Sequence, residues 1–439
     1  MKRANRVFLA VGFVSLIIIS WVIVLGAKSN DDKQTELIAQ ATAYLNDEVY
    51  ILAVPLLEEA AVYNAVHTLE AEAMLKEVYL HLMDQRGYRR KYIDLLEKQM
   101  SRKDAAPEVF HEAASFYLDG SKYTEAFTVL KDGIAKTGNN DLVNLYESNR
   151  YAYRLGYDFY DDVTMIHGTT IGVSRDGLWG IANADGSLQI PCMYEKISTF
   201  SVDRAIVQRD GKIFAIDRNN NRCALLKENA SDFGNFASDR LPIQIDGKWY
   251  RSTGDFERGS AAFDWVGTHV DGNAAALSNG KWGVINRSAD WVVPAEYDEI
   301  IMDELGRAYG QGAVFARKGG ALYLIVNGVQ TGEAYEDARP FGSEGYAAVK
   351  QNGLWGFINT SGEVMIPYSD EYEDALSFGQ HLAAVKQGEY WGYISLYGDL
   401  AIEPIFLQAK SFADGNAPVL TERGWRFLTL TEYRKGAGL

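Results

Sequence analysis

The sequence predicts an N-terminal transmembrane helix, an all-α domain of helical hairpins and then an all-β repeat array. Residues 7–27 form an apolar run that contains no charged side chain. Residues 28–155 hold four glycines and no tryptophan, whereas residues 156–439 hold 35 glycines and eight tryptophans. Because glycine is poor inside helices and common in turns, this step separates a helical part from a part of strands and turns.

The apolar run predicts a membrane anchor. About 20 apolar residues span a bilayer as a helix, and the positive residues before the run (Lys2, Arg3 and Arg6) orient the N-terminus toward the cytoplasm. We therefore expect residues 1–29 to be a cytoplasmic tail and a single-pass signal anchor in the cell membrane, with the bulk of the chain extracytoplasmic. A cleaved signal peptide is the open alternative.

Composition excludes several classes of protein. The chain has 43 Lys and Arg against 59 Asp and Glu, a net charge of −16, and nucleic-acid binders need a basic surface. We therefore expect no nucleic-acid partner. Two cysteines exclude a disulfide framework and a four-cysteine zinc site. Whether Cys192 and Cys223 pair stays open, since pairing is permitted outside the membrane.

Residues 30–155 show small and large apolar residues at helical spacing. The pattern occurs twice, once from Leu37 and once from Phe110, with the same internal offsets. It resembles the tetratricopeptide repeat, whose 34-residue unit is a pair of helices; generic helical hairpins are the alternative. Residues 139–155 are expected to form a closing helix. The matching positions are Leu37, Ala41, Tyr44, Ala53 and Leu57 in one set, and Phe110, Ala114, Tyr117, Ala126 and Leu130 in the other.

Residues 156–439 contain an internal repeat with a mean period of about 35 residues. The anchors fall at positions 179, 213, 249, 282, 322, 355, 391 and 425, and the interval from 282 to 322 is the longest. Ile213 and Leu322 replace tryptophan in degenerate copies. The predicted structural anchors are Trp179, Trp249, Trp282, Trp355, Trp391 and Trp425, together with Gly180, Gly283, Gly356 and Gly392.

The pattern of each repeat predicts a small antiparallel meander. An alternating strand such as 346–350 leads into Asn352-Gly353, a two-residue hairpin signal, and the Trp-Gly strand follows. A short third strand is expected to end at a proline, as at Pro367, because proline removes a ladder donor. One unit has too little core to stand alone, so its aromatic residues are expected to stack against neighbouring units. The glycine after the tryptophan leaves room for a ring or a backbone.

The repeated Gly-(Lys/Leu)-Trp-Gly-x-Ile, followed by Ile-Pro and Tyr-(Asp/Glu), resembles the WG (or KWG) repeat of bacterial proteins. The resemblance covers nearly all of residues 168–430 and implies repeat architecture and binding rather than a reaction. We favour a propeller-like ring of seven or eight blades, because ring closure protects strand edges; an open β-solenoid is the alternative. The units at Ile213, Trp249 and Leu322 depart from the pattern.

Motifs for catalysis or cofactors are absent from the sequence. The acids at 296–299 and 370–374 could be paired glycosidase carboxylates, but they recur at one repeat position and are interpreted as solvated loop acids. Trp282 and its equivalents are interpreted as core rather than a ligand-stacking box. We expect no catalytic residue, cofactor or metal. None of the six histidines is at metal spacing with another: His67, His81, His111, His167, His269 and His381.

These observations predict a membrane-anchored, extracytoplasmic scaffold that binds protein or glycan partners through its helical and repeat surfaces. The alternative is an envelope-associated hydrolase with a carboxylate site in the β-repeat domain. The sequence predicts neither the partner's identity nor the oligomeric state.

Overall fold

The computed structural model describes residues 29–63, 65–226 and 229–432. The chain divides into two compact units, Met1–Asn149 and Arg150–Leu439, whereas the sequence placed the boundary between 155 and 156. The expected membrane segment, residues 7–27, lies outside the described residues. Among the described residues, no helix is both long enough and apolar enough to cross a bilayer.

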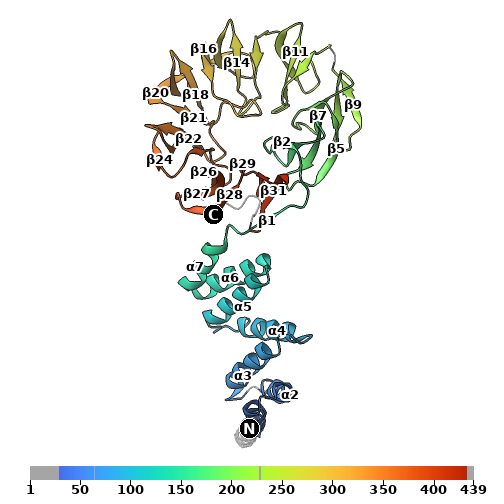
Figure 1. Ribbon diagram of the computed structural model, residues 1–439, viewed down its shortest axis with the longest axis vertical. Coiled ribbons are helices and arrows are strands. Elements are labelled where there is room, and N and C mark those ends of the chain that lie inside the picture. Colours follow the sequence, from blue (N-terminus) through green and yellow to red (C-terminus); the bar gives the residue numbers. More distant parts are fainter. Residues whose placement is uncertain (1–28, 64, 227–228, 433–439) are drawn as a thin grey trace, which may run out of the picture. The chain divides into compact units, whose positions relative to one another are not determined.

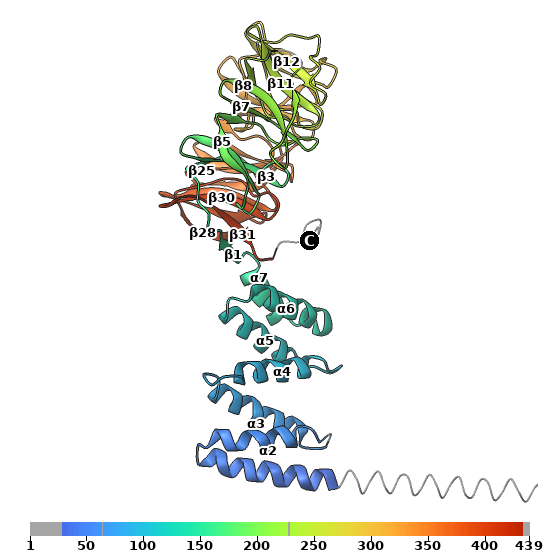
Figure 2. The ribbon, with the colours of Figure 1, turned by 90° about the vertical axis from the view of Figure 1, so that its right-hand side faces the viewer.

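The first unit is a stack of helices, each of which from α2 onward contacts the next (Figure 2). The small and large residues of the sequence pattern form its core: Ala53, Leu57, Phe110, Ala114 and Leu130 are fully buried. A helix covers residues 29–46, and those that follow are α2 (Tyr50–Ala60), α3 (Thr68–His81), α4 (Tyr88–Met100), α5 (Pro107–Asp119), α6 (Tyr123–Thr137) and α7 (Asn140–Asn149).

The closing helix is shorter than predicted. It ends at Asn149, and Tyr153 lies in strand β1 (Tyr153–Leu155) of the second unit. The prediction of a helix through residue 155 was wrong because residues 153–155 find a strand partner, β31, at the other end of the unit's sequence.

The second unit is an eight-bladed β-propeller (Figure 1). Each blade is an antiparallel sheet with a short innermost strand, and the chain order gives blades 1 to 8. The strands are β2 (Asp162–Val163), β3 (Thr170–Arg175), β4 (Leu178–Asn183) and β5 (Leu188–Tyr194) in blade 1; β6 (Lys196–Ile197), β7 (Arg204–Arg209), β8 (Lys212–Asp217) and β9 (Arg222–Leu225) in blade 2; β10 (Asp232–Phe233), β11 (Arg240–Ile245) and β12 (Lys248–Thr253) in blade 3; β13 (Trp265–Val266), β14 (Ala274–Ser278), β15 (Lys281–Ile285) and β16 (Trp291–Tyr297) in blade 4; β17 (Glu299–Ile300), β18 (Ala313–Lys318), β19 (Ala321–Val326) and β20 (Val329–Tyr335) in blade 5; β21 (Asp337–Ala338), β22 (Tyr346–Gln351), β23 (Leu354–Asn359) and β24 (Val364–Ser369) in blade 6; β25 (Asp374–Ala375), β26 (Leu382–Gln387), β27 (Tyr390–Ser395) and β28 (Leu400–Phe406) in blade 7; and β29 (Gln408–Ala409), β30 (Asn416–Thr421) and β31 (Gly424–Leu430) with β1 in blade 8.

The ring is closed by pairing between the two ends of the unit. Strand β1 is the outer strand of blade 8 and pairs with β31, with Tyr153 opposite Leu430. The Arg426 guanidinium adds two hydrogen bonds to the Gly156 carbonyl, at 2.9 and 2.7 Å. The closed ring confirms the favoured prediction and excludes the open β-solenoid.

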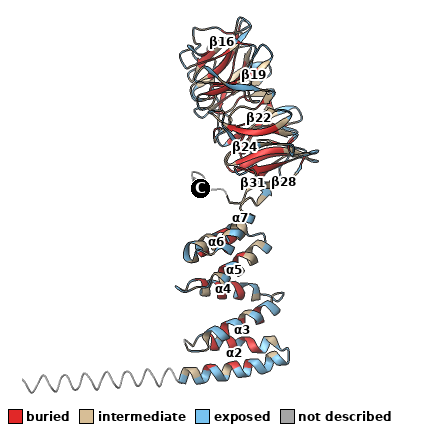
Figure 3. Ribbon diagram, turned by 90° about the vertical axis from the view of Figure 1, so that its left-hand side faces the viewer, coloured by how far each residue is buried: buried red, intermediate tan, exposed pale blue. Residues whose placement is uncertain are grey.

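The core is shared between neighbouring blades, as the aromatic content predicted. The rings of Phe357 in blade 6 and Phe378 in blade 7 meet at 4.9 Å between centroids, and both are fully buried. Figure 3 shows this burial along the long strands of the blades. The predicted hairpin turns are also present: Asn352 and Gly353 have φ angles of 53° and 80°, as a type I′ turn requires.

The outer strand does not end at its proline, contrary to the prediction. Strand β5 runs through Pro191 to Tyr194, with a shift in its register against β4. On an outermost strand the missing proline N–H removes no ladder bond. A Cβ on Gly180 would lie 2.4 Å from the Ile190 carbonyl oxygen, so glycine is needed for this irregular backbone to come close.

Glycine and proline therefore act as a pair within a blade. The four blades with glycine after the tryptophan (1, 4, 6 and 7) each have a proline in the outer strand. In blades 2, 3 and 5 the glycine is replaced by Phe214, Tyr250 and Tyr323. The outer strands of blades 2 and 5, and the segment at the equivalent place in blade 3, contain no proline. Blade 3 has only three strands in the described part of the chain.

We expect Gly283→Ala to lower the free energy of unfolding by about 1–3 kcal/mol, because its Cβ would lie 2.5 Å from the Val293 carbonyl oxygen. Chemical denaturation of the purified chain measures this loss. The control is Gly310→Ala, whose Cβ meets its nearest neighbour at 3.7 Å and should cost less than about 0.5 kcal/mol. Equal losses in the two variants would contradict the close approach.

Candidate functional site

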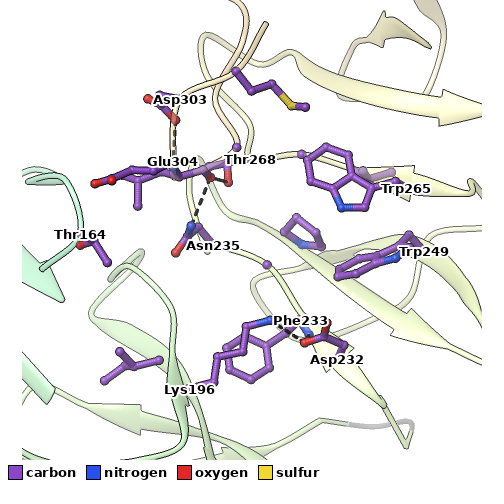
Figure 4. A pocket seen from close by; sticks show the side chains of 18 of the residues that line it. Thr164, Lys196, Asp232, Phe233, Asn235, Trp249, Trp265, Thr268, Asp303 and Glu304 are labelled. Carbon is purple, nitrogen blue, oxygen red and sulfur yellow. Dashed lines mark hydrogen bonds and ion pairs between the residues drawn. The ribbon is translucent and has the colours of Figure 1, made fainter. Parts of the chain in front are cut away.

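A cavity of about 550 Å³ lies inside the ring, against the innermost strands β6, β10 and β13 (Figure 4). Strand β4 of blade 1 and the connection that follows β17 in blade 5 also contribute to its wall. This size suits a small ligand, for which pockets of roughly 300–1,000 Å³ are typical. We call it the channel pocket.

One wall of the channel pocket is aromatic. Trp249 and Trp265 lie 6.4 Å apart between ring centroids, and Trp265 also contacts Trp282 at 5.3 Å. Trp179 and Phe233 also line the pocket. Trp265 is half-buried and stands at the first position of an innermost strand, where every other blade has a charged residue or glutamine.

An ion pair between blades 2 and 3 lies below the tryptophan wall, on the side of the pocket away from Asp303 and Glu304 (Figure 4). The Lys196 Nζ lies 2.5 Å from the Asp232 Oδ1, and the two side chains keep 42% and 39% of their surface exposed. The ammonium also lies 4.8 Å from the centre of the Phe233 ring, and the Phe233 N–H donates to the Asp232 Oδ1 at 2.8 Å. Backbone and ring thus hold the pair in place.

Residues 301–312, which we call the channel loop, connect β17 to β18. This loop has twelve residues, against six in the equivalent connections 164–169 and 198–203. It accounts for the long interval between the anchors at 282 and 322. The Asp303 Oδ1 accepts the backbone N–H groups of Leu305 and Arg307, at 3.0 and 2.9 Å, and so holds the loop in a tight turn.

The channel loop crosses the ring and contacts blades on several sides. The Leu305 carbonyl accepts hydrogen bonds from the Asn235 side chain, at 3.1 Å, and from the Thr268 hydroxyl. The Glu304 carboxylate pairs with the Lys410 Nζ of blade 8 at 2.5 Å. Burial raises the pKa of Glu304, although Lys410 opposes the shift.

The channel loop also reaches the connection that follows β2 in blade 1. The Arg307 Nη2 lies 3.7 Å from the Met165 Sδ, while its Nε pairs with the Asp303 carboxylate at 2.6 Å. Together with the bonds to Asn235, Thr268 and Lys410, these contacts tie the channel loop to blades 1, 3, 4 and 8.

The predicted structural anchors occupy two kinds of position. Trp249, Trp355 and Trp425 are buried, whereas Trp179, Trp282 and Trp391 are half-buried. Trp179 and Trp249 also line the channel pocket. The glycines of these repeats meet the outer strand: a Cβ on Gly180, Gly283 or Gly392 would strike its backbone, and one on Gly356 would strike the Tyr368 ring.

Two of the acids considered as glycosidase carboxylates, Asp298 and Glu373, hold hairpin turns. The Asp298 carboxylate accepts hydrogen bonds from Lys281, at 2.6 Å, and from the Gly319 N–H, at 2.8 Å, and these bonds lower its pKa. The Glu373 carboxylate accepts the Gly388 N–H at 2.8 Å in the same way. Each acid thus caps the turn between the second and third strands of its own blade.

Cys192 and Cys223 are both free. Within residues 29–63, 65–226 and 229–432, no group of three or more His, Cys, Asp or Glu side chains is arranged to hold a metal ion.

The sequence did not predict that Trp265, the Lys196–Asp232 pair and the channel loop are parts of a site. Two signals were available for them. One was the long interval that contains the loop, and the other was an aromatic residue, Trp265, directly after the repeat's acid, Asp264.

Comparison with known proteins identifies the repeat. The family described as "WG containing repeat" matches residues 179–212, 282–304, 334–355, 355–391 and 391–425. A search of curated proteins found no match.

Three solved structures are among those to which this chain is similar. A eukaryotic initiation factor is 6% identical, covering 60% of this chain and 82% of its own, with a TM-score of 0.40. YCF48 from Cyanidioschyzon merolae is 11% identical, covering 64% and 100%, with a TM-score of 0.32. The Neurospora crassa Pan2 WD40 domain is 9% identical, covering 63% and 91%, with a TM-score of 0.32.

We expect the histidine next to Thr268 to make the stability of the propeller depend on pH. His269 is 1% exposed, and burial, followed by the charges of Arg251 and Arg240, lowers its pKa from 6.5 to about 3. The folded state therefore keeps this ring neutral while the unfolded chain takes up a proton. Its contribution to stability is present above pH 6.5 and is lost as the pH falls.

We expect this single group to cost about 2 kcal/mol of unfolding free energy between pH 6.5 and pH 5. Denaturant titrations of the wild type and of His269→Gln at several pH values measure it. The variant should lose less stability on acidification than the wild type. Identical pH slopes would show that His269 is not held neutral.

Proposed function

Residues 179–425 of this chain belong to the WG repeat family, and from that premise we propose that the propeller is a binding scaffold for a protein or glycan partner. The observation that carries the proposal is the channel pocket, where a tryptophan wall lies next to the partly exposed Lys196–Asp232 pair. Concave sites with an apolar lining and a few placed polar groups are where proteins hold ligands.

We propose binding rather than hydrolysis for this site. A glycoside hydrolase needs one protonated carboxyl group and one free carboxylate on either side of the bond. Each carboxylate of the pocket wall has a cationic partner instead: Asp232 pairs with Lys196, Asp303 with Arg307 and Glu304 with Lys410. These pairs favour a recognition site.

The helical unit is proposed to be a tetratricopeptide-like array that adds a protein-binding surface. In support, α2, α5 and α6 bury the small and large residues that the repeat pattern predicted, including Ala53, Phe110 and Leu130. The middle pair, α3 and α4, buries Tyr79 and Tyr92 in the same core. Stacked helix pairs of this kind are used widely to bind extended partners.

The scaffold is proposed to work outside the cytoplasm, tethered by residues 7–27. The sequence of this segment supports the tether, because it is apolar, carries no charged side chain and follows three positive residues.

We expect a photo-crosslinking amino acid placed at Met302, in the pocket wall, to form an adduct with the partner in living cells. The same amino acid at Tyr390, an exposed residue of β27, is the control and should give no such adduct. Mass spectrometry of the purified full-length chain detects the product. Adducts at position 390 with none at 302 would place the partner elsewhere and contradict the proposal.

The full-length chain is expected to stay with the membrane fraction after alkaline carbonate extraction, whereas residues 30–439 alone should be released. Immunoblotting of the two fractions measures this. Release of the full-length product, with a new N-terminus close to residue 27, would favour the cleaved signal peptide instead.

A further inference from the structure

We propose that the channel pocket binds the terminal unit of an uncharged oligosaccharide. This inference rests on the proposed role of the pocket as a binding site, and it adds the chemical class of the ligand and the way in which the ligand enters.

The aromatic wall suits the face of a pyranose ring. Trp265 is half-buried, and Trp249 and Trp282 pack against it at 6.4 and 5.3 Å, which holds its ring in place. A fixed indole provides a large apolar surface with one polar N–H. The C–H face of a sugar fills such a surface, while the hydroxyl groups at its edge remain free to bond.

The same rings do not form a cage for an organic cation. A cage needs aromatic faces on several sides of the charge, each within about 6 Å of it. Trp249 and Trp265 are in contact with one another, at a tilt of 51°, so they leave no space for a cation between them. They form one continuous wall instead.

The Lys196–Asp232 pair is arranged to bind two neighbouring hydroxyl groups. A hydroxyl both donates and accepts, so a sugar diol can donate to the carboxylate and accept from the ammonium. The pair is fixed by Phe233, yet both side chains remain more than a third exposed. In Figure 4 it lies on the opposite side of the pocket from the channel loop, below the tryptophan wall.

Charge favours a neutral ligand. Every ionic group of the described wall is already neutralised by a partner, including Glu304 by Lys410 and Asp303 by Arg307, while the whole chain carries −16. An acidic sugar would meet no uncompensated cation on this wall and would be repelled at long range.

The channel loop decides which part of a glycan can enter. Residues 303–307 contact blades 1, 3, 4 and 8 and so lie across the ring beside the pocket. A polymer threaded through the ring would meet this loop, so we expect the pocket to take a chain end. The amount of ligand bound should therefore depend on the concentration of chain ends and not on the total mass of polysaccharide.

Isothermal titration of the full-length protein tests the proposal with three neutral probes: chitotriose, cellotriose and maltotriose. We expect at least one to bind, and expect Trp265→Phe and Asp232→Asn to weaken it at least tenfold. Two matched controls should change affinity less than twofold. Trp391→Phe alters a half-buried anchor outside the pocket, and Asp298→Asn alters a similar pair, with Lys281, that lies away from it.

The outcomes separate this inference from the proposed function. Equal weakening by the pocket and control variants, or no binding of any probe, would overturn the saccharide assignment. Tetramethylammonium binding in place of the sugars would indicate a cation site. A peptide adduct at position 302 in cells would retain the scaffold and exclude the sugar. A long polymer that binds as well per unit mass as the trisaccharide would exclude recognition of chain ends.

Discussion

The pairing of β1 with β31 is the constraint on which the propeller depends. Each blade buries its aromatic residues against a neighbour, so a row of blades has two unsatisfied faces until its ends meet. Three residues, 153–155, complete blade 8 and join those ends. In the closed ring the channel loop contacts both Lys410 of blade 8 and Met165 of blade 1.

Much of this architecture could be predicted from the repeat. A period of about 35 residues with Asn-Gly or Asp-Gly turns indicates a meander, and the aromatic content indicates a shared core. The outer strand could not be predicted, because the irregular passage through Pro191 depends on space left by Gly180 in another strand. Strand β1 was missed since it carries no Trp-Gly motif and its partner lies at the far end of the unit's sequence.

The site was harder to predict than the fold. Trp179 and Trp249 were visible as anchors, but whether an indole faces a core or a cavity depends on the neighbouring blade. Lys196 and Asp232 belong to different repeats, and the residues around each of them do not predict an ion pair. The long interval between the anchors at 282 and 322 indicated an inserted loop. The length of the interval does not predict that the loop turns into the ring.

Closure by the first strand also has a consequence for biogenesis. The partner of β1, strand β31, follows blades 1 to 7 in the sequence, so β1 has no partner in the ring while those blades are synthesised. Such a distant contact slows folding and prolongs the exposure of edges that can aggregate. Until residues 424–430 are made, β1 lacks the strand that it pairs with in the ring, and its free edge is available for pairing with another chain.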